Sequence, residues 1–151
     1  MMPLIPLTMA CLMQASTYYH LDYRVMESIR KVEAGQVGKI SINRNGTYDV
    51  GPFQINSFWI RQIRKDGYPL DPVKLRDNGC VNAWFAGYIM KRLVVNAPGH
   101  SVWYAIGAWH SGSPALADGY RKKVFAVMVR LYGNQEKKGV LEAMKTAGGN
   151  P

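Results

Sequence analysis

A single β-like stretch, residues 39–49, interrupts a chain whose other segments show helical patterns. The stretch alternates apolar and polar residues around Ile40 and Ile42, and it contains Asn45-Gly46, a dipeptide typical of a tight hairpin turn in which both turn residues have positive φ. A turn centred on that dipeptide would place Ile42 opposite Asp49. We therefore predict an α+β fold that is mostly helical, with one small β-hairpin.

Helical patterns lie on both sides of the hairpin. A helix capped by Asp22 is predicted to extend to about Ala34, with Gly35 as its stop signal. A second helix is predicted to begin after the hairpin, with Asn56 or Ser57 as its N-cap.

Three more helices are predicted over about 78–96, 101–109 and 115–132, the last with Gly133 as its C-cap. On the first of these, one wide apolar face is expected to point into the core: Val81, Trp84, Phe85, Tyr88, Ile89 and Leu93. On the last, the residues expected to point inward are Tyr120, Val124, Val127, Met128 and Leu131.

The length of 151 residues suits one folded domain, predicted over 11–132. Residues 1–15 are apolar but have no Lys or Arg before the apolar stretch; we interpret them as a weak remnant of an export signal that overlaps the first helix. Residues 133–151 are predicted to form a flexible tail. The sequence has no run of 18 apolar residues, so no transmembrane helix is expected.

The charge balance favours an anionic partner. Lys and Arg number 19 against 10 acidic residues, a formal net charge of +9. The basic residues are scattered, however, and a solvated basic face explains them equally well. No zinc-finger spacing, RNP-type strand or helix-turn-helix signature is present, so nucleic acid is not an expected partner. A basic module that binds a glycan or another polyanion without turnover is the non-enzymatic alternative.

Glu33 and Asp49 are the residues with the strongest chemical signal. Glu33 lies in the last turn of its helix, at the end of the apolar stripe formed by Met26 and Ile29. Burial raises the pKa of a carboxyl group, and a negative charge near a helix C-terminus is unfavourable. A protonated acid beside an ionised one suits glycosidic-bond cleavage. Spacing alone also allows two ordinary surface acids.

The segments around these two acids, residues 31–35 and 43–56, resemble the lysozyme-like superfamily. The similarity is strongest to the small lytic transglycosylases of secretion, conjugation and pilus machines. It rests on Glu33 at a helix end, on Asn45-Gly46, and on the run from Asp49 to Gln54-Ile55-Asn56. It continues at 80–82 and 105–114. The resemblance implies a lysozyme-like fold with the hairpin beside a catalytic cleft.

The resemblance also implies roles for single residues. Glu33 matches the family's acid and base, and Gln54 matches a glutamine that binds the sugar. Trp109 replaces the tyrosine that usually donates its hydroxyl to the catalytic Glu, so this hydroxyl is expected to be missing unless His110 substitutes for it. The other residues expected to bind substrate are Gly51, Asn56 and Ser111, although Gly51 could equally form a bulge and Ser111 a cap or turn.

The activity implied is that of a peptidoglycan lytic transglycosylase, which cleaves the β-1,4 bond between N-acetylmuramic acid and N-acetylglucosamine and leaves a 1,6-anhydro product. No metal or other cofactor is implied, and Asp49 would be a supporting group. The alternative is a muramidase that uses Glu33 and Asp49 together. The resemblance further implies a monomer in the periplasm or cell envelope, acting on peptidoglycan strands beside a secretion, conjugation or pilus machine.

Cys11 and Cys80 are the only cysteines. They are too few for a zinc site, and the residues alone allow either two thiols or one disulfide. The resemblance implies a disulfide, because relatives often have one cysteine at the start of the first helix and another on the core helix. An oxidising compartment would permit that bond.

Overall fold

The computed structural model describes residues 3–133 of the chain. The elements are α1 (Met9–Tyr18), α2 (Tyr23–Glu33), β1 (Ile40–Ile42), β2 (Tyr48–Val50), β3 (Ile55–Asn56), α3 (Ser57–Lys65), α4 (Pro72–Asp77), α5 (Gly79–Asn96), the 3-10 turn Pro98–His100, α6 (Val102–His110) and α7 (Pro114–Tyr132). The predicted mostly helical α+β class is confirmed. The flexible tail predicted for 133–151 lies outside the described residues, apart from Gly133, which is the C-cap of α7.

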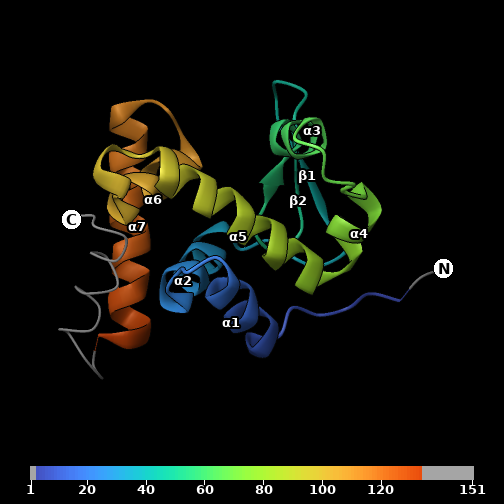
Figure 1. Ribbon diagram of the computed structural model, residues 1–151, viewed down its shortest axis with the longest axis horizontal. Helices are drawn as coiled ribbons and strands as arrows, with labels where there is room; N and C mark the ends of the chain where they lie inside the picture. The colour runs from blue at the N-terminus through green and yellow to red at the C-terminus, as the bar shows by residue number, and fades with distance from the viewer. Residues whose placement is uncertain (1–2, 134–151) are drawn as a thin grey trace.

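The long helix α5 crosses the middle of the molecule (Figure 1). The small sheet, α3 and α4 lie toward one end of α5, and α6 and α7 lie toward the other. α1 and α6 both pack against α5, while α2 packs against α7. One apolar cluster runs through α2, the sheet, α5, α6 and α7. The end of α2 is thereby held between the sheet and the helices that follow α5.

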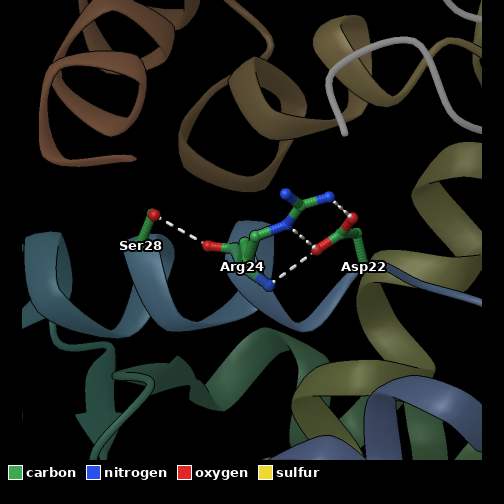
Figure 2. A network of polar contacts seen from close by, with 3 residues as sticks. All are labelled: Asp22, Arg24 and Ser28. Atoms are coloured by element: carbon green, nitrogen blue, oxygen red, sulfur yellow. Dashed lines mark hydrogen bonds and ion pairs between the residues drawn. The ribbon is translucent and has the colours of Figure 1, made fainter. Parts of the chain in front are cut away.

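α2 begins with a local polar network at its N-terminus. Asp22 accepts a hydrogen bond from the backbone N–H of Arg24 at 2.8 Å and also pairs with the guanidinium of Arg24, while the Ser28 hydroxyl donates to the Arg24 carbonyl at 2.7 Å (Figure 2). The bond from Arg24 N to Asp22 satisfies a helix N–H group that lacks an intrahelical partner. The predicted start at Asp22 is therefore confirmed.

The end of α2 differs from the prediction in one residue. Glu33 is the last helical residue, one residue before the predicted end at about Ala34, and the residue in the left-handed conformation is Ala34, at φ 55°, and not Gly35. Gly35 is constrained by packing instead: a Cβ there would lie 2.0 Å from the Gly51 carbonyl oxygen. A glycine at 35 lets the chain after Glu33 pass directly against the turn that follows β2.

The hairpin register is one residue away from the predicted one. Ile42 pairs with Tyr48 and not with Asp49, which pairs with Ser41. The cause is a three-residue loop closed by a hydrogen bond from Asn43 N to Thr47 O at 2.8 Å, in which Gly46 has positive φ and Asn45 does not. The observed register places Asp49 directly opposite Asn56 on β3, a strand that was not predicted.

The inward face of α5 also differs from the prediction. Of the six apolar residues expected there, only Ile89 is fully buried; the buried face is made largely of smaller side chains, including Asn82, Ala83 and Ala86. α1, α4 and α6 all pack against α5, and small residues allow their close approach. On α7 the prediction holds for Tyr120, Val124 and Met128, which are buried, whereas Val127 and Leu131 are half-buried.

A disulfide joins Cys11 on α1 to Cys80 on α5, with the two Cα atoms 5.7 Å apart. The expected bond is therefore present. Leu12, inside the segment predicted as an export-signal remnant, is 1% exposed and belongs to the core. Between residues 3 and 133, no helix is both long and apolar enough to cross a membrane.

Candidate active site

A cleft of about 480 Å³ lies between the sheet, the start of α3 and the end of α6. Its volume is within the usual range for small-ligand sites. All the predicted site residues except Gly51 line it: Glu33, Asp49, Gln54, Asn56, Trp109, His110 and Ser111. The fold therefore brings together residues from four separate segments of the sequence.

Glu33 is held by two hydrogen-bond donors. The Tyr120 hydroxyl donates to Oε2 of Glu33 at 2.5 Å, and the Trp109 side chain also hydrogen-bonds the carboxyl group. Burial raises the pKa of Glu33 above its ordinary value; these two hydrogen bonds act against the rise, and the negative charge of Asp49 adds to it. The net rise keeps the acid protonated to a higher pH than an ordinary Glu, as a proton donor requires.

The expectation that Glu33 lacks a tyrosine hydroxyl is wrong. A tyrosine hydroxyl does reach Glu33, but it comes from Tyr120 on α7 and not from position 109. Burial and the nearby Glu33 carboxylate both raise the pKa of Tyr120, so its hydroxyl stays protonated and donates. Periodicity had identified Tyr120 only as a core residue. The feature of the sequence that could have indicated this contact is the hydroxyl group of an inward-facing tyrosine, because a buried hydroxyl needs a hydrogen-bond partner.

His110 does not take the place of the missing tyrosine. Its ring stacks on that of Tyr120, with centroids 4.7 Å apart and planes 4° from parallel. The contact restrains the ring that carries the hydroxyl.

Asp49 is bound by two side-chain amides. Asn43 donates to Oδ2 at 3.1 Å and Asn56 donates to Oδ1 at 2.9 Å. Both amides also donate to the Thr47 hydroxyl oxygen, and the Oδ1 of Asn56 caps α3 at Phe58. Each Asp49 oxygen therefore already has a hydrogen-bond donor. This arrangement suits a carboxylate whose negative charge acts electrostatically on Glu33.

Gln54 and Gly51 form one tight turn after β2. Gln54 has a positive φ of 51°, and both its backbone N and its Nε2 donate to the Gly51 carbonyl at 3.0 Å. The Gln54 side chain thus bonds the backbone while lining the cleft. Gly51 is buried at φ 71°, and a Cβ on it would lie 2.3 Å from Nδ2 of Asn82. The close approach of Asn82 therefore requires a glycine at position 51.

Asn82 holds this turn onto α5. It is fully buried, its Oδ1 accepts from Phe53 N at 3.0 Å, and its Nδ2 donates to the carbonyls of Val50 at 3.0 Å and Leu75 at 3.1 Å. In the sequence, Asn82 stands out only as part of the resemblance. It bonds three backbone groups around Gly51 and so holds the turn that carries Gln54 against α5.

Ser111 ends α6 as its C-cap, and its Oγ accepts from Ser113 N at 3.0 Å. It therefore shapes the turn at the rim of the cleft. Trp109 packs edge-on against Phe53, with ring centroids 6.2 Å apart. This contact holds the indole beside Glu33.

Comparison with known proteins places the chain near three curated relatives. No family model matches it. The invasion protein IagB of Salmonella typhimurium is 29% identical over 128 residues, 82% of this chain and 78% of the relative. Protein IpgF of Shigella flexneri is 25% identical over 123 residues (81% and 78%). A peptidoglycan-binding-like protein of Escherichia coli O157:H7 is 25% identical over 141 residues (87% and 83%). The chain is thus similar, over most of its length, to proteins named for invasion and for peptidoglycan binding.

Proposed function

We propose that this protein is a peptidoglycan lytic transglycosylase with Glu33 as its only catalytic acid and base. The observation that carries the proposal is the environment of Glu33: a partly buried carboxyl with a raised pKa, held by Tyr120 and Trp109 at the edge of a cleft. Such a carboxyl can deliver a proton to a glycosidic oxygen near neutral pH. The relative named for peptidoglycan binding supports the choice of polymer.

The reaction needs two proton transfers through the same carboxyl. Glu33 first protonates the glycosidic oxygen, and the bond from the muramyl C1 to that oxygen breaks. The Glu33 carboxylate then removes the proton of the muramyl 6-hydroxyl, whose oxygen bonds to C1. The product is a 1,6-anhydro sugar, Glu33 is again protonated, and no water is consumed.

The muramidase reaction is the second candidate, because Asp49 lies in the same cleft and its charge acts on Glu33. A hydrolase needs the second carboxylate as a nucleophile or as a base for water. The two amides on Asp49 favour the first candidate, since a carboxylate with both oxygens hydrogen-bonded is a weaker nucleophile.

The proposed place of action is the periplasm or cell envelope, where the enzyme would open the wall locally for an envelope-spanning machine. The Cys11–Cys80 disulfide supports an oxidising compartment. The relative named as an invasion protein supports the link to such a machine.

Mass spectrometry of fragments released from purified peptidoglycan tests the proposal. Wild type should release anhydro-muramyl ends, and Glu33→Gln should release none. Asp71→Asn is the matched control, since Asp71 is exposed, caps α4 and can be replaced by an equally good capping residue. Reducing ends that carry one added water would instead identify a muramidase. No release from wild type would refute both enzymes.

A further inference from the structure

A second hollow adjoins the cleft. It has a volume of about 510 Å³, and it shares Ala108, Ser111 and Gly112 with the cleft. Trp103, Tyr104 and Arg121 also line it, and we call it the Arg121 pocket. Because the two hollows share part of their lining, a branch of a polymer lying in the cleft can reach the Arg121 pocket.

Arg121 brings unused hydrogen-bond donors to this pocket. Its side chain is only 13% exposed. Nε donates to the Trp103 carbonyl at 2.8 Å, and Nη2 lies 3.5 Å from the Tyr104 carbonyl. Nη1 is 3.9 Å from the nearest Asp118 oxygen, beyond hydrogen-bond range. A guanidinium has five N–H groups, so within residues 3–133 both hydrogens on Nη1 lack a protein acceptor.

The guanidinium is fixed in place before any ligand binds. A Cβ on Gly107 of α6 would lie 2.5 Å from the Arg121 Cζ and 2.6 Å from its Nη2, so the glycine makes the space that the guanidinium fills. The Tyr104 ring covers it, with the Cζ 5.5 Å from the ring centroid. A cation that is already ordered loses little entropy on binding an anion.

Asp118 is the nearest competing anion, but another partner draws it away. Its Oδ2 accepts an ion pair from Lys122 at 3.0 Å, and its side chain is 50% exposed. The pairing of Asp118 with Arg121, at 3.9 Å and with the Asp118 side chain half exposed, is weak. A ligand carboxylate could therefore take the Nη1 position in a forked pairing, the geometry that guanidinium groups favour.

We propose that the Arg121 pocket binds a carboxylate carried by the muramyl branch of the glycan in the cleft. The inference rests on the proposed function in taking peptidoglycan as the polymer. Two sources have this chemistry: the free lactyl group of a bare strand, and the stem peptide of a substituted strand. Arg121 would thus set a preference for muramyl-containing glycans over neutral ones.

Equilibrium binding in the Glu33→Gln background tests this without turnover. Three ligands of equal length are compared: an oligomer of N-acetylglucosamine, an alternating oligomer with free lactyl groups, and the same oligomer with stem peptides. Arg121→Gln should weaken binding of a carboxylate ligand about tenfold and leave the neutral oligomer unchanged. The carboxylate ligand that loses affinity identifies the source. Lys123→Gln is the control, because it removes the same charge from an exposed side chain two positions further along α7.

Two further arms protect the test from misfolding of the Arg121 variant. Gly107→Ala should displace the guanidinium and produce the same selective loss while keeping the charge. Reducing the ligand carboxylate to an alcohol should cost about tenfold with Arg121 intact. If Arg121→Gln lowers the affinity for neutral and carboxylate ligands equally, or lowers neither, the proposal for the Arg121 pocket is wrong. If wild type cleaves peptidoglycan but Arg121→Gln binds all three ligands as well as wild type does, only the proposal for the Arg121 pocket fails. If Arg121→Gln selectively loses the carboxylate ligands but wild type cleaves nothing, the pocket proposal stands and the proposed enzymatic activity fails.

Discussion

The Tyr120 hydroxyl lies 2.5 Å from Oε2 of Glu33, and the two residues are 87 positions apart in the chain. The contact joins α7 to the last residue of α2, two helices that pack directly against each other. Trp109, on α6, hydrogen-bonds the same carboxyl group. The hydroxyl is thus supplied by a different helix to the same carboxyl.

Substitutions of Tyr120 and Asp49 should shift the pKa of Glu33 in opposite directions. The Tyr120 hydrogen bond lowers that pKa and the Asp49 charge raises it. The first step of the proposed reaction needs protonated Glu33, so activity should fall as pH rises through the pKa of Glu33. Tyr120→Phe should therefore move the alkaline limb of kcat/KM to higher pH, and Asp49→Asn should move it to lower pH.

Tyr18→Phe is the control for that experiment, because Tyr18 is 66% exposed and lies outside the residues that line the cleft. Its profile should match wild type. Shifts of Tyr120→Phe and Asp49→Asn in the same direction would contradict the electrostatic account.

Glu33→Gln should stabilise the protein at neutral pH while abolishing cleavage. The folded-state pKa of Glu33 is raised, so the stability that its protonated form contributes is fully present below the ordinary Glu pKa and is lost as pH rises through the raised value. An amide has no such loss. Thermal unfolding should show a higher Tm than wild type at pH 8, with the difference shrinking below pH 4. A lower Tm for Glu33→Gln at both pH values would argue against a buried Glu33 carboxyl group with a raised pKa.

Removing the disulfide should cost about 4 kcal/mol of unfolding free energy, because the bond joins residues 69 positions apart and restricts the unfolded chain. Urea denaturation of a Cys11→Ser, Cys80→Ser variant measures the loss. Wild type in reductant should match the variant. A loss well under 1 kcal/mol would show that the packing of α1 on α5 suffices without the bond.

Gly35→Ala should destabilise the fold by about 2 kcal/mol and reduce activity, since its Cβ would meet the Gly51 carbonyl oxygen at 2.0 Å. Either the chain just after Glu33 or the turn of Gln54 must move. Gly119→Ala, in α7, is the matched control: nothing lies within 4 Å of its Cβ position. That variant should gain about 0.5–1 kcal/mol from helix propensity. Urea denaturation and the peptidoglycan assay report both effects.

Much of the helical framework was predictable because the signals are local. Asp22, Asn56 and Ser101 each cap a helix through a side-chain hydrogen bond to an N–H two or three residues later. The hairpin turn was located correctly, but its register was wrong by one residue, because Asn45 bonds within a longer loop. α4 and β3 are six and two residues long, too short for periodicity to identify.

The candidate cleft residues were identified by resemblance, and all but Gly51 do line one cleft. Their partners could not be identified in that way. Gly51 is a glycine because Asn82 lies against it, and Gln54 bonds its own turn. Such contacts depend on how the folded chain packs, and they produce no periodic pattern in the amino-acid sequence.

Local signals in the sequence are enough to predict where α2, α3 and α6 begin and that Glu33 ends an apolar stripe, because capping bonds and helical repeats act over three or four residues. The surroundings of that carboxyl group depend on how the helices and strands pack together. The Tyr120 hydroxyl, the amides on Asp49 and the guanidinium of Arg121 reach their positions through the packing of α2 on α7, of β2 on β3 and of α6 on α7. Such positions depend on the shapes of whole buried surfaces, and no local pattern encodes them.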